Sequence, residues 1–278
     1  MKFNRAYIEI TNICNMHCSF CHGTKRAARR MSVDEFSHVL CELSGVTEYI
    51  YLHVMGEPLG HPELFSMIEM AKVRGFKVAI TTNGSLLPTR ARFLLDAVPY
   101  KVNISLHSFE NGTDEEMLRY IDGCVRFAAE AARRGTLIIM RLWNRGSDLG
   151  RNSLVLDRLR AAFPDGEWRE GARGYRMMDK LHVEYGDRFE WPDAEGDMLG
   201  DEVFCHGMGD HFGILSDGTV IPCCLDADGE IALGNLFVKP LSDILSSERA
   251  QAIRHGFECK RAVEELCKRC PYARRFKI

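Results

Sequence analysis

The run Cys14-Asn15-Met16-His17-Cys18-Ser19-Phe20-Cys21 places three cysteines in one short loop near the start of the chain. A cubane iron–sulfur cluster contains about four irons, and each is usually held by a cysteine thiolate. A loop with three thiolates therefore leaves one iron open to bind and activate a small molecule. The alternative is a structural zinc site, in which His17 or His22 supplies the fourth ligand of a closed tetrahedron.

The remaining cysteines are also grouped, which favours metal ligation over disulfides. The chain has 278 residues and eleven cysteines. In a reducing cytosol, cysteines serve as metal ligands or reactive thiols. Two lie apart from the groups, Cys41 and Cys124, and both are predicted to be small buried hydrophobes. The second group lies near the C-terminal end and comprises Cys205, Cys223, Cys224, Cys259, Cys267 and Cys270.

Composition argues against several classes of partner. The net charge is -3, so there is no overall positive charge to attract nucleic acid or an acidic membrane. Residues 1–5 lack the apolar core of a signal peptide, and no apolar run approaches the roughly 20 residues of a membrane span. We therefore expect a cytoplasmic protein with no nucleic-acid or membrane partner.

Strand-like and helix-like patterns alternate up to about residue 184. Such alternation predicts a parallel sheet with right-handed crossovers, and about six units predict an α/β fold of the open, partial (β/α)6 barrel type, similar to part of a TIM barrel. Chemistry in such barrels gathers at the carboxyl ends of the strands, and the three-cysteine loop follows the first strand. The expected strands are 6–10, 48–54, 76–81, 101–106, 137–142 and 181–184, and the expected helices are 33–43, 62–75, 90–97, 113–134 and 154–163.

A change in composition predicts a second, smaller unit. Residues 186–200 are polar and aromatic with no clear period, which indicates a linker. Beyond it, the turn Ser216-Asp217-Gly218 between two apolar runs predicts a hairpin, and residues 240–255 predict a helix. We therefore expect a barrel over residues 1–190, followed over residues 191–278 by the linker and a cysteine-rich module.

The pattern Cys-x3-Cys-x-aromatic-Cys resembles the signature of radical S-adenosylmethionine (SAM) enzymes. The resemblance implies that Cys14, Cys18 and Cys21 bind a 4Fe-4S cluster whose open iron chelates SAM. In that family the reduced cluster cleaves SAM, and the resulting 5'-deoxyadenosyl radical abstracts a hydrogen atom from the substrate. The chemistry belongs to the cofactor, which the protein binds, orients and shields.

Further motifs of this family follow in the expected order. Met55-Gly56-Glu57-Pro58 resembles the Gly-Glu-Pro motif, which implies that Gly56 and Glu57 bind the amino group of SAM. A backbone carbonyl and a carboxylate suit that role because both accept charge-assisted hydrogen bonds from an ammonium ion. Thr81-Thr82-Asn83-Gly84 resembles the Thr-Asn-Gly run of the family, and we assign Asn83 to the cofactor site.

Four single residues complete the expected pocket. Phe20 occupies the aromatic position that packs near the adenine, and Ser105 ends the fourth strand, where relatives contact SAM. His107 departs from the acidic residue that is common two positions after that serine. Arg141 lies near the end of the fifth strand and is predicted to point into the pocket, although no motif supports it.

The C-terminal cysteines are similar to the four-cysteine Twitch module, the short form of the SPASM extension. The resemblance implies an auxiliary 4Fe-4S cluster. Cys224 directly follows one of the matching cysteines, and adjacent side chains in a strand point to opposite faces, so Cys224 ranks second as a ligand. Cys259 is a structural thiol or an additional ligand, and zinc remains the alternative metal. The four matching residues are Cys205, Cys223, Cys267 and Cys270.

These resemblances predict an enzyme and leave its reaction open. We expect hydrogen abstraction followed by a redox-neutral or oxidative change of dehydrogenase type, assisted by the auxiliary cluster. The alternatives are a maturase or epimerase that modifies a peptide and, from another class, a non-catalytic iron–sulfur or zinc redox protein. The expected partners are a small-molecule or peptide substrate and a reductant of the flavodoxin or ferredoxin type. The basic run 25–30 is either a solvated segment, a recognition site for an anionic substrate or a docking surface for that reductant.

Overall fold

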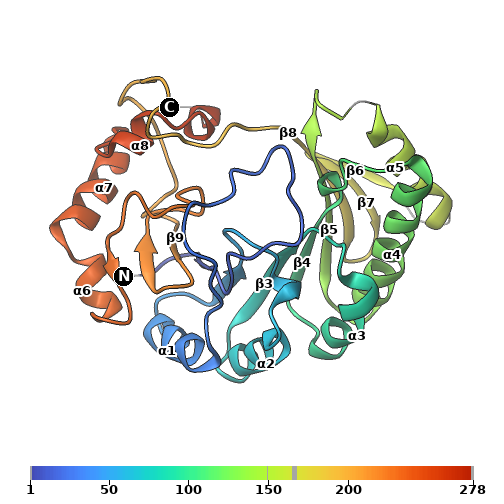
Figure 1. The fold of residues 1–278 in the computed structure, drawn as a ribbon, viewed down its shortest axis with the longest axis horizontal. Coiled ribbons are helices and arrows are strands. Elements are labelled where there is room, and N and C mark those ends of the chain that lie inside the picture. Colours follow the sequence, from blue (N-terminus) through green and yellow to red (C-terminus); the bar gives the residue numbers. More distant parts are fainter. Residues whose placement is uncertain (1, 149, 165–167, 277–278) are drawn as a thin grey trace.

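A computed structural model describes residues 2–148, 150–164 and 168–276. Its centre is a run of six parallel strands, which confirms the predicted open α/β barrel (Figure 1). The described strands form one sheet in the order β11-β10-β9-β1-β2-β3-β4-β5-β8-β7-β6, whose two edges remain unpaired with each other. The six central strands are β1 (Arg5–Ile8), β2 (Tyr49–Leu52), β3 (Lys77–Thr82), β4 (Lys101–Ser105), β5 (Leu137–Arg145) and β8 (Leu181–Asp187).

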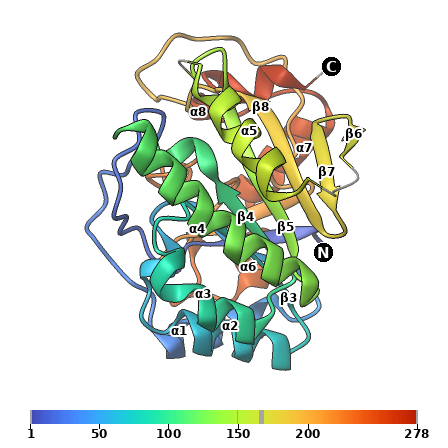
Figure 2. The same cartoon turned by 90° about the vertical axis from the view of Figure 1, so that its right-hand side faces the viewer.

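Five helices cover the outer face of this sheet (Figures 1 and 2). Capping boxes set the first turns of two of them: Ser32 with Glu35 begins α1, as the sequence predicts, and Thr113 with Glu116 begins α4. No helix of the described residues is both long enough and apolar enough to cross a membrane. The helices are α1 (Val33–Leu43), α2 (Leu64–Val73), α3 (Leu87–Ala97), α4 (Asp114–Arg133) and α5 (Arg151–Ala162).

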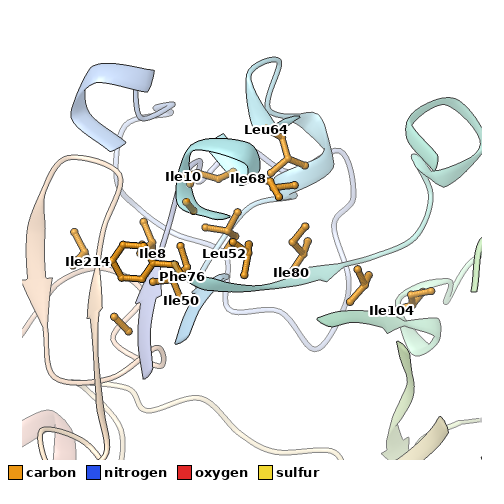
Figure 3. Packing of buried hydrophobic residues seen from close by; sticks show 14 of the residues in the cluster. Ile8, Ile10, Ile50, Leu52, Leu64, Ile68, Phe76, Ile80, Ile104 and Ile214 are labelled. Atoms are coloured by element: carbon orange, nitrogen blue, oxygen red, sulfur yellow. The ribbon is translucent and has the colours of Figure 1, made fainter. Parts of the chain in front are cut away.

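Alternation along the strands separates an apolar outer face from a polar interior. In β1 and β2, Ile8, Ile50 and Leu52 are fully buried and face the helices. Leu64 and Ile68 of α2 belong to the same apolar cluster (Figure 3). The intervening residues face the barrel interior because successive strand side chains point to opposite faces. They are largely polar and include Tyr7, Tyr51, Thr81, Asn103, Ser105 and Arg141.

The C-terminal module extends the barrel sheet. Strand β9 (His211–Ile214) pairs in parallel with β1, and β10 (Thr219–Ile221) completes the predicted hairpin. The module therefore adjoins the strand that leads into the three-cysteine loop. Its other elements are β11 (Gly234–Asn235), α6 (Leu241–Leu245), α7 (Glu248–Glu258), α8 (Glu265–Lys268) and a 3-10 turn, η3 (Tyr272–Arg275).

Two sequence predictions differ from the structure, and one hairpin was not predicted. The helix expected over 240–255 is divided, because the Ser247 side chain accepts a hydrogen bond from the Ala250 amide and begins α7 as a separate helix. An antiparallel hairpin of β6 (Arg169–Gly171) and β7 (Gly174–Met178) precedes β8 and went unpredicted. Cys124 is buried as predicted, but Cys41 is exposed, because it lies on the outer face of α1.

Candidate functional site

The three-cysteine loop follows β1 and lies across the carboxyl ends of the strands (Figure 1). The Cys21 amide donates to the Cys18 carbonyl at 3.1 Å, which forms a tight turn between these two residues. The Met16 amide lies 3.4 Å from the Cys14 sulfur, and the Cys18 thiol lies 3.7 Å from the Ser108 carbonyl. The loop therefore presents three thiols at the mouth of the barrel.

The thiols are close enough to affect one another electrostatically. Burial raises the pKa of Cys18 to about 11. The neighbouring Cys21 and Cys14 also raise this pKa, whereas the hydrogen bond to Ser108 lowers it. Burial likewise raises the pKa of Cys14, and Glu57 and Cys21 add to the shift. Thiols in this state are protonated at neutral pH, so metal binding must release protons.

Glu57 connects two of the loops at this edge. Its carboxylate is buried and accepts two hydrogen bonds from backbone amides. The Leu59 amide donates to one oxygen at 2.9 Å, and the Asn83 amide donates to the other at 2.7 Å. Burial raises its pKa, and these hydrogen bonds oppose that shift. A carboxylate has about four lone-pair sites, so acceptor capacity for an ammonium group remains.

Gly56 allows the Glu57 loop to pack directly against the three-cysteine loop. Its φ is +76°, and a Cβ atom there would collide with the Thr11 carbonyl oxygen and lie 2.9 Å from the Asn12 carbonyl carbon. The Glu57 amide then donates to the Ile13 carbonyl at 3.0 Å. Only glycine permits both the left-handed backbone and this close approach.

We expect Gly56→Ala to lower the free energy of unfolding by more than about 3 kcal/mol. A left-handed backbone costs about 1–3 kcal/mol for a residue other than glycine, and the collision with Thr11 adds to that cost. The matched control is Gly45→Ala, because Gly45 has a φ of +75° and no atom within 4 Å of the added Cβ. Denaturant titration of the two variants measures the difference, and equal destabilisation would contradict the close-packing role of Gly56.

The Thr-Asn-Gly run also holds the three-cysteine loop. The side-chain nitrogen of Asn83, Nδ2, donates to the Asn15 side-chain oxygen at 3.0 Å and lies 3.9 Å from the Cys14 sulfur. The Asn15 amide group in turn donates to the Ser85 hydroxyl at 2.8 Å. Asn83 thus contacts the first cysteine of the loop. Ser105 pairs in register with Arg141 and is only partly buried at the same edge.

A cavity opens beside Phe20, between the three-cysteine loop and the end of β5. Its lining includes Phe20, His107, Trp143, Asp148 and Arg188. The Phe20 ring lies 4.8 Å from the His107 ring. His107 Nδ1 lies 3.0 Å from the Arg141 carbonyl and 3.3 Å from the Trp143 amide nitrogen. Burial lowers the pKa of His107 to about 4, so this residue is a neutral wall of the cavity.

Residues 186–200, predicted as a linker, include contacts to the three-cysteine loop that sequence reasoning missed. An Arg188 guanidinium nitrogen donates to the Ser19 carbonyl at 3.0 Å, and Trp191 Nε1 donates to the Phe20 carbonyl at 2.9 Å. The Trp191 ring also stacks on His22 at 5.8 Å. This segment crosses from β8 to the C-terminal module (Figure 1). The only hint of these contacts in the sequence was Trp191, a large aromatic residue in a segment without a helix or strand pattern.

In the basic run 25–30, Lys25 and Arg30 are exposed, whereas Arg26 and Arg29 are partly buried and paired. Arg26 forms an ion pair at 2.6 Å with Glu9, which is buried at the end of β1, and Arg29 forms one at 2.6 Å with Glu35. Glu9 also accepts a hydrogen bond from the Ser216 hydroxyl at 2.9 Å. These two arginines therefore connect the three-cysteine loop to the barrel and to the C-terminal hairpin.

The four expected cysteines of the C-terminal module lie near one another. Burial is the main cause that raises the pKa of each of these thiols. The thiols also interact electrostatically with one another: Cys205 and Cys267 each interact with both Cys223 and Cys270. The Gly207 amide lies 3.4 Å from the Cys205 sulfur. Four thiols with a nearby amide donor are a donor set that suits a complete iron–sulfur cluster.

Cys224 and Cys259 are the two remaining cysteines of this group, and only Cys224 interacts with the four, through Cys205 and Cys223. Cys224 packs with Val54, Met55 and Tyr7 on the barrel side of the hairpin, and its thiol interacts with the Tyr7 hydroxyl. Cys259 is exposed, with its sulfur 3.7 Å from His255 Nε2. In the described part of the chain, no three His, Cys, Asp or Glu side chains converge on a single-ion site. Cluster ligands each bind a different iron, so they do not have to meet at one point.

Comparison with known families adds two matches. Residues 8–136 match the radical SAM superfamily, and residues 205–271 match an iron–sulfur cluster-binding domain, SPASM. These two domain types imply a 4Fe-4S cluster with SAM in the first and an auxiliary cluster in the second. The two matched segments contain the N-terminal and C-terminal cysteine groups, respectively.

Individual similar proteins cover different shares of the chain. A tungsten-containing aldehyde ferredoxin oxidoreductase cofactor-modifying protein from Pyrococcus furiosus is 36% identical over 85 residues, which span 29% of this chain and 24% of that protein. BtrN in complex with AdoMet and 2-DOIA has a TM-score of 0.60 at 18% identity, covering 97% of this chain and 94% of BtrN. Streptococcus suis SuiB bound to S-adenosylmethionine has a TM-score of 0.61 at 16% identity, covering 97% and 72%. At these identities the structural likeness concerns the fold.

Proposed function

The chain belongs to the radical SAM superfamily, and from that premise we propose that it removes a hydrogen atom from a small molecule held in the barrel and oxidises it. When bound, the N-terminal cluster and SAM supply a 5'-deoxyadenosyl radical, and the auxiliary cluster supplies a one-electron acceptor. In this proposal Cys14, Cys18 and Cys21 hold the first cluster. The auxiliary cluster is held by Cys205, Cys223, Cys267 and Cys270.

The observation that carries the proposal is the contact between the C-terminal hairpin and the barrel interior. Cys224, next to the cluster ligand Cys223, reaches Tyr7. The Tyr7 ring faces the interior and lies 5.6 Å from Tyr51 and 5.9 Å from His53. An electron acceptor at Cys223 would therefore lie beside the substrate space, which favours oxidation over a redox-neutral reaction.

The other residues of the site position the cofactor. Glu57 and Gly56 provide acceptors for the amino group of SAM, and Asn83 fixes the loop that carries Cys14. Phe20 provides an apolar face for the adenine in the cavity beside His107. Trp191, which donates to the Phe20 carbonyl, helps to hold that face in place. A low-potential flavodoxin or ferredoxin would be the reductant.

Anaerobic reconstitution tests the proposal without knowledge of the substrate. With iron, sulfide, SAM and dithionite, we expect the protein to produce 5'-deoxyadenosine, which liquid chromatography detects. Omission of SAM or dithionite should remove the product. Protein isolated with a full complement of zinc and no iron, inactive after reconstitution, would instead support the non-catalytic redox protein.

A further inference from the structure

Arg141 lies in the barrel interior, and its guanidinium forms no hydrogen bond or ion pair with the residues that the structure describes. It lies in β5 and pairs in register with Ser105 of β4 on one side and Glu184 of β8 on the other. Its Nε atom is buried and has no hydrogen-bond partner among the described residues. Its guanidinium carbon lies 4.3 Å from the centroid of the Trp143 ring. The head group therefore lies over the Trp143 ring, on the interior face of β5.

The charges around Arg141 leave a positive excess. Arg5 is neutralised by Asp210 at 2.6 Å, which leaves Lys101 and Arg141 facing the single carboxylate of Glu184. Glu184 acts on Arg141 at longer range and forms no ion pair with it in the part of the chain that the structure describes. His53 adds no charge at neutral pH, because burial lowers its pKa to about 4.

Arg141 is partly buried, and its inaccessible Nε donor has neither water nor a protein acceptor among the residues that the structure describes. Taking a charge out of water costs several kcal/mol unless hydrogen bonds and a counter-charge compensate. A guanidinium carries five N–H donors in a planar fork, and a carboxylate matches two of them at once. An anionic, planar group such as a carboxylate is therefore the partner that this guanidinium fits best.

We propose that Arg141 binds a carboxylate of the substrate at the carboxyl edge of the sheet, beside Ser105. The inference rests on the proposed function and names its substrate class: a small carboxylate-bearing molecule. The side chains that share its interior surroundings, Tyr7 and Tyr51, offer phenol groups for the hydroxyl or amino substituents of such a substrate. Arg141 is thus a specificity-determining residue.

The carboxylate of SAM itself is the other source of the same chemistry. The electrostatic neighbours of Arg141 argue for the substrate, because they lie on β8, β1, β2 and the C-terminal module: Glu184, Tyr7, Tyr51 and Tyr272. Glu57 and Cys14, at the other end of the expected cofactor site, are not among the groups that shift the pKa of Arg141, although Ser105 of that site is its register partner. The experiment separates the two sources.

Saturation-transfer NMR with acetate, the smallest stable organic carboxylate probe, tests the site on the reconstituted, oxidised protein. We expect transfer to the acetate methyl group, little transfer to acetamide, and at least a tenfold loss of the acetate signal in Arg141→Gln. The control is Arg145→Gln on the same strand, whose exposed side chain lies 3.7 Å from Asp187 and should leave the signal unchanged. Melting temperatures of both variants establish that they are folded.

Two outcomes would overturn the assignment. One is an acetate signal that is absent, or equal in wild type and Arg141→Gln. The other is displacement of acetate by SAM together with a tenfold weaker dissociation constant for SAM in Arg141→Gln, measured by equilibrium dialysis, which would assign Arg141 to SAM. Neither measurement requires SAM cleavage, so failure here is distinguishable from failure of the proposed function.

Discussion

Cys18→Ala is expected to reduce SAM cleavage to background. Cys18 is the central thiol of the loop, and its charge interacts with both Cys21 and Cys14. Without it, one iron of the cluster loses its ligand, and two thiols from one loop do not hold a cubane cluster. The loss should exceed the roughly 10–100-fold effects of changes to groups that only surround a metal ligand. The production of 5'-deoxyadenosine after anaerobic reconstitution measures it.

Cys41→Ala is the matched control, because Cys41 is an exposed thiol on α1. It should keep both the iron content and the rate of SAM cleavage. Iron analysis of Cys18→Ala should show that the auxiliary cluster remains, so that about four irons are bound per chain. SAM cleavage by Cys18→Ala at more than a tenth of the wild-type rate would contradict the assigned role of the loop.

The barrel was predictable because its signals are local. Each central strand is a short apolar run between turn residues, and the capping box of Ser32 and Glu35 determines where α1 begins. The hairpin β6–β7 was not predictable in this way, because its residues are mostly exposed or half-buried and carry no apolar alternation. The division between α6 and α7 depends on one capping serine, Ser247, within an otherwise helical pattern.

The motifs of the site could be predicted from the sequence, but the contacts between distant segments that hold it together could not. Cys14, Glu57 and Asn83 lie on loops that the strand order brings to one edge, and hydrogen bonds connect Asn83 with both of the others. The contact of Trp191 with Phe20 joins residues 171 positions apart, which no local pattern reveals. The ion pair of Glu9 with Arg26 could not be predicted either, because nothing in the sequence distinguishes these two residues from other charged residues.

Cys223→Ala should lower the iron content, whereas Cys224→Ala should leave it unchanged. The two residues are adjacent, and both thiols interact with Cys205. Only Cys223 also interacts with Cys267, whereas Cys224 packs against Tyr7 in the barrel. Loss of a ligand should remove the auxiliary cluster, so Cys223→Ala should bind about four irons per chain and Cys224→Ala about eight. Iron analysis and Mössbauer spectroscopy of reconstituted protein measure this difference.

The comparison also tests the link between the module and the barrel. Cys224→Ala removes the thiol that contacts Tyr7 and leaves the expected ligand set intact, so its auxiliary cluster should form as in the wild type. Cys223→Ala should retain the N-terminal cluster, because Cys14, Cys18 and Cys21 lie on a different loop. If instead Cys224→Ala loses the auxiliary cluster while Cys223→Ala keeps it, the hairpin must present Cys224 to the metal, and the contact with Tyr7 that supports an oxidative reaction would be lost in the folded holoprotein.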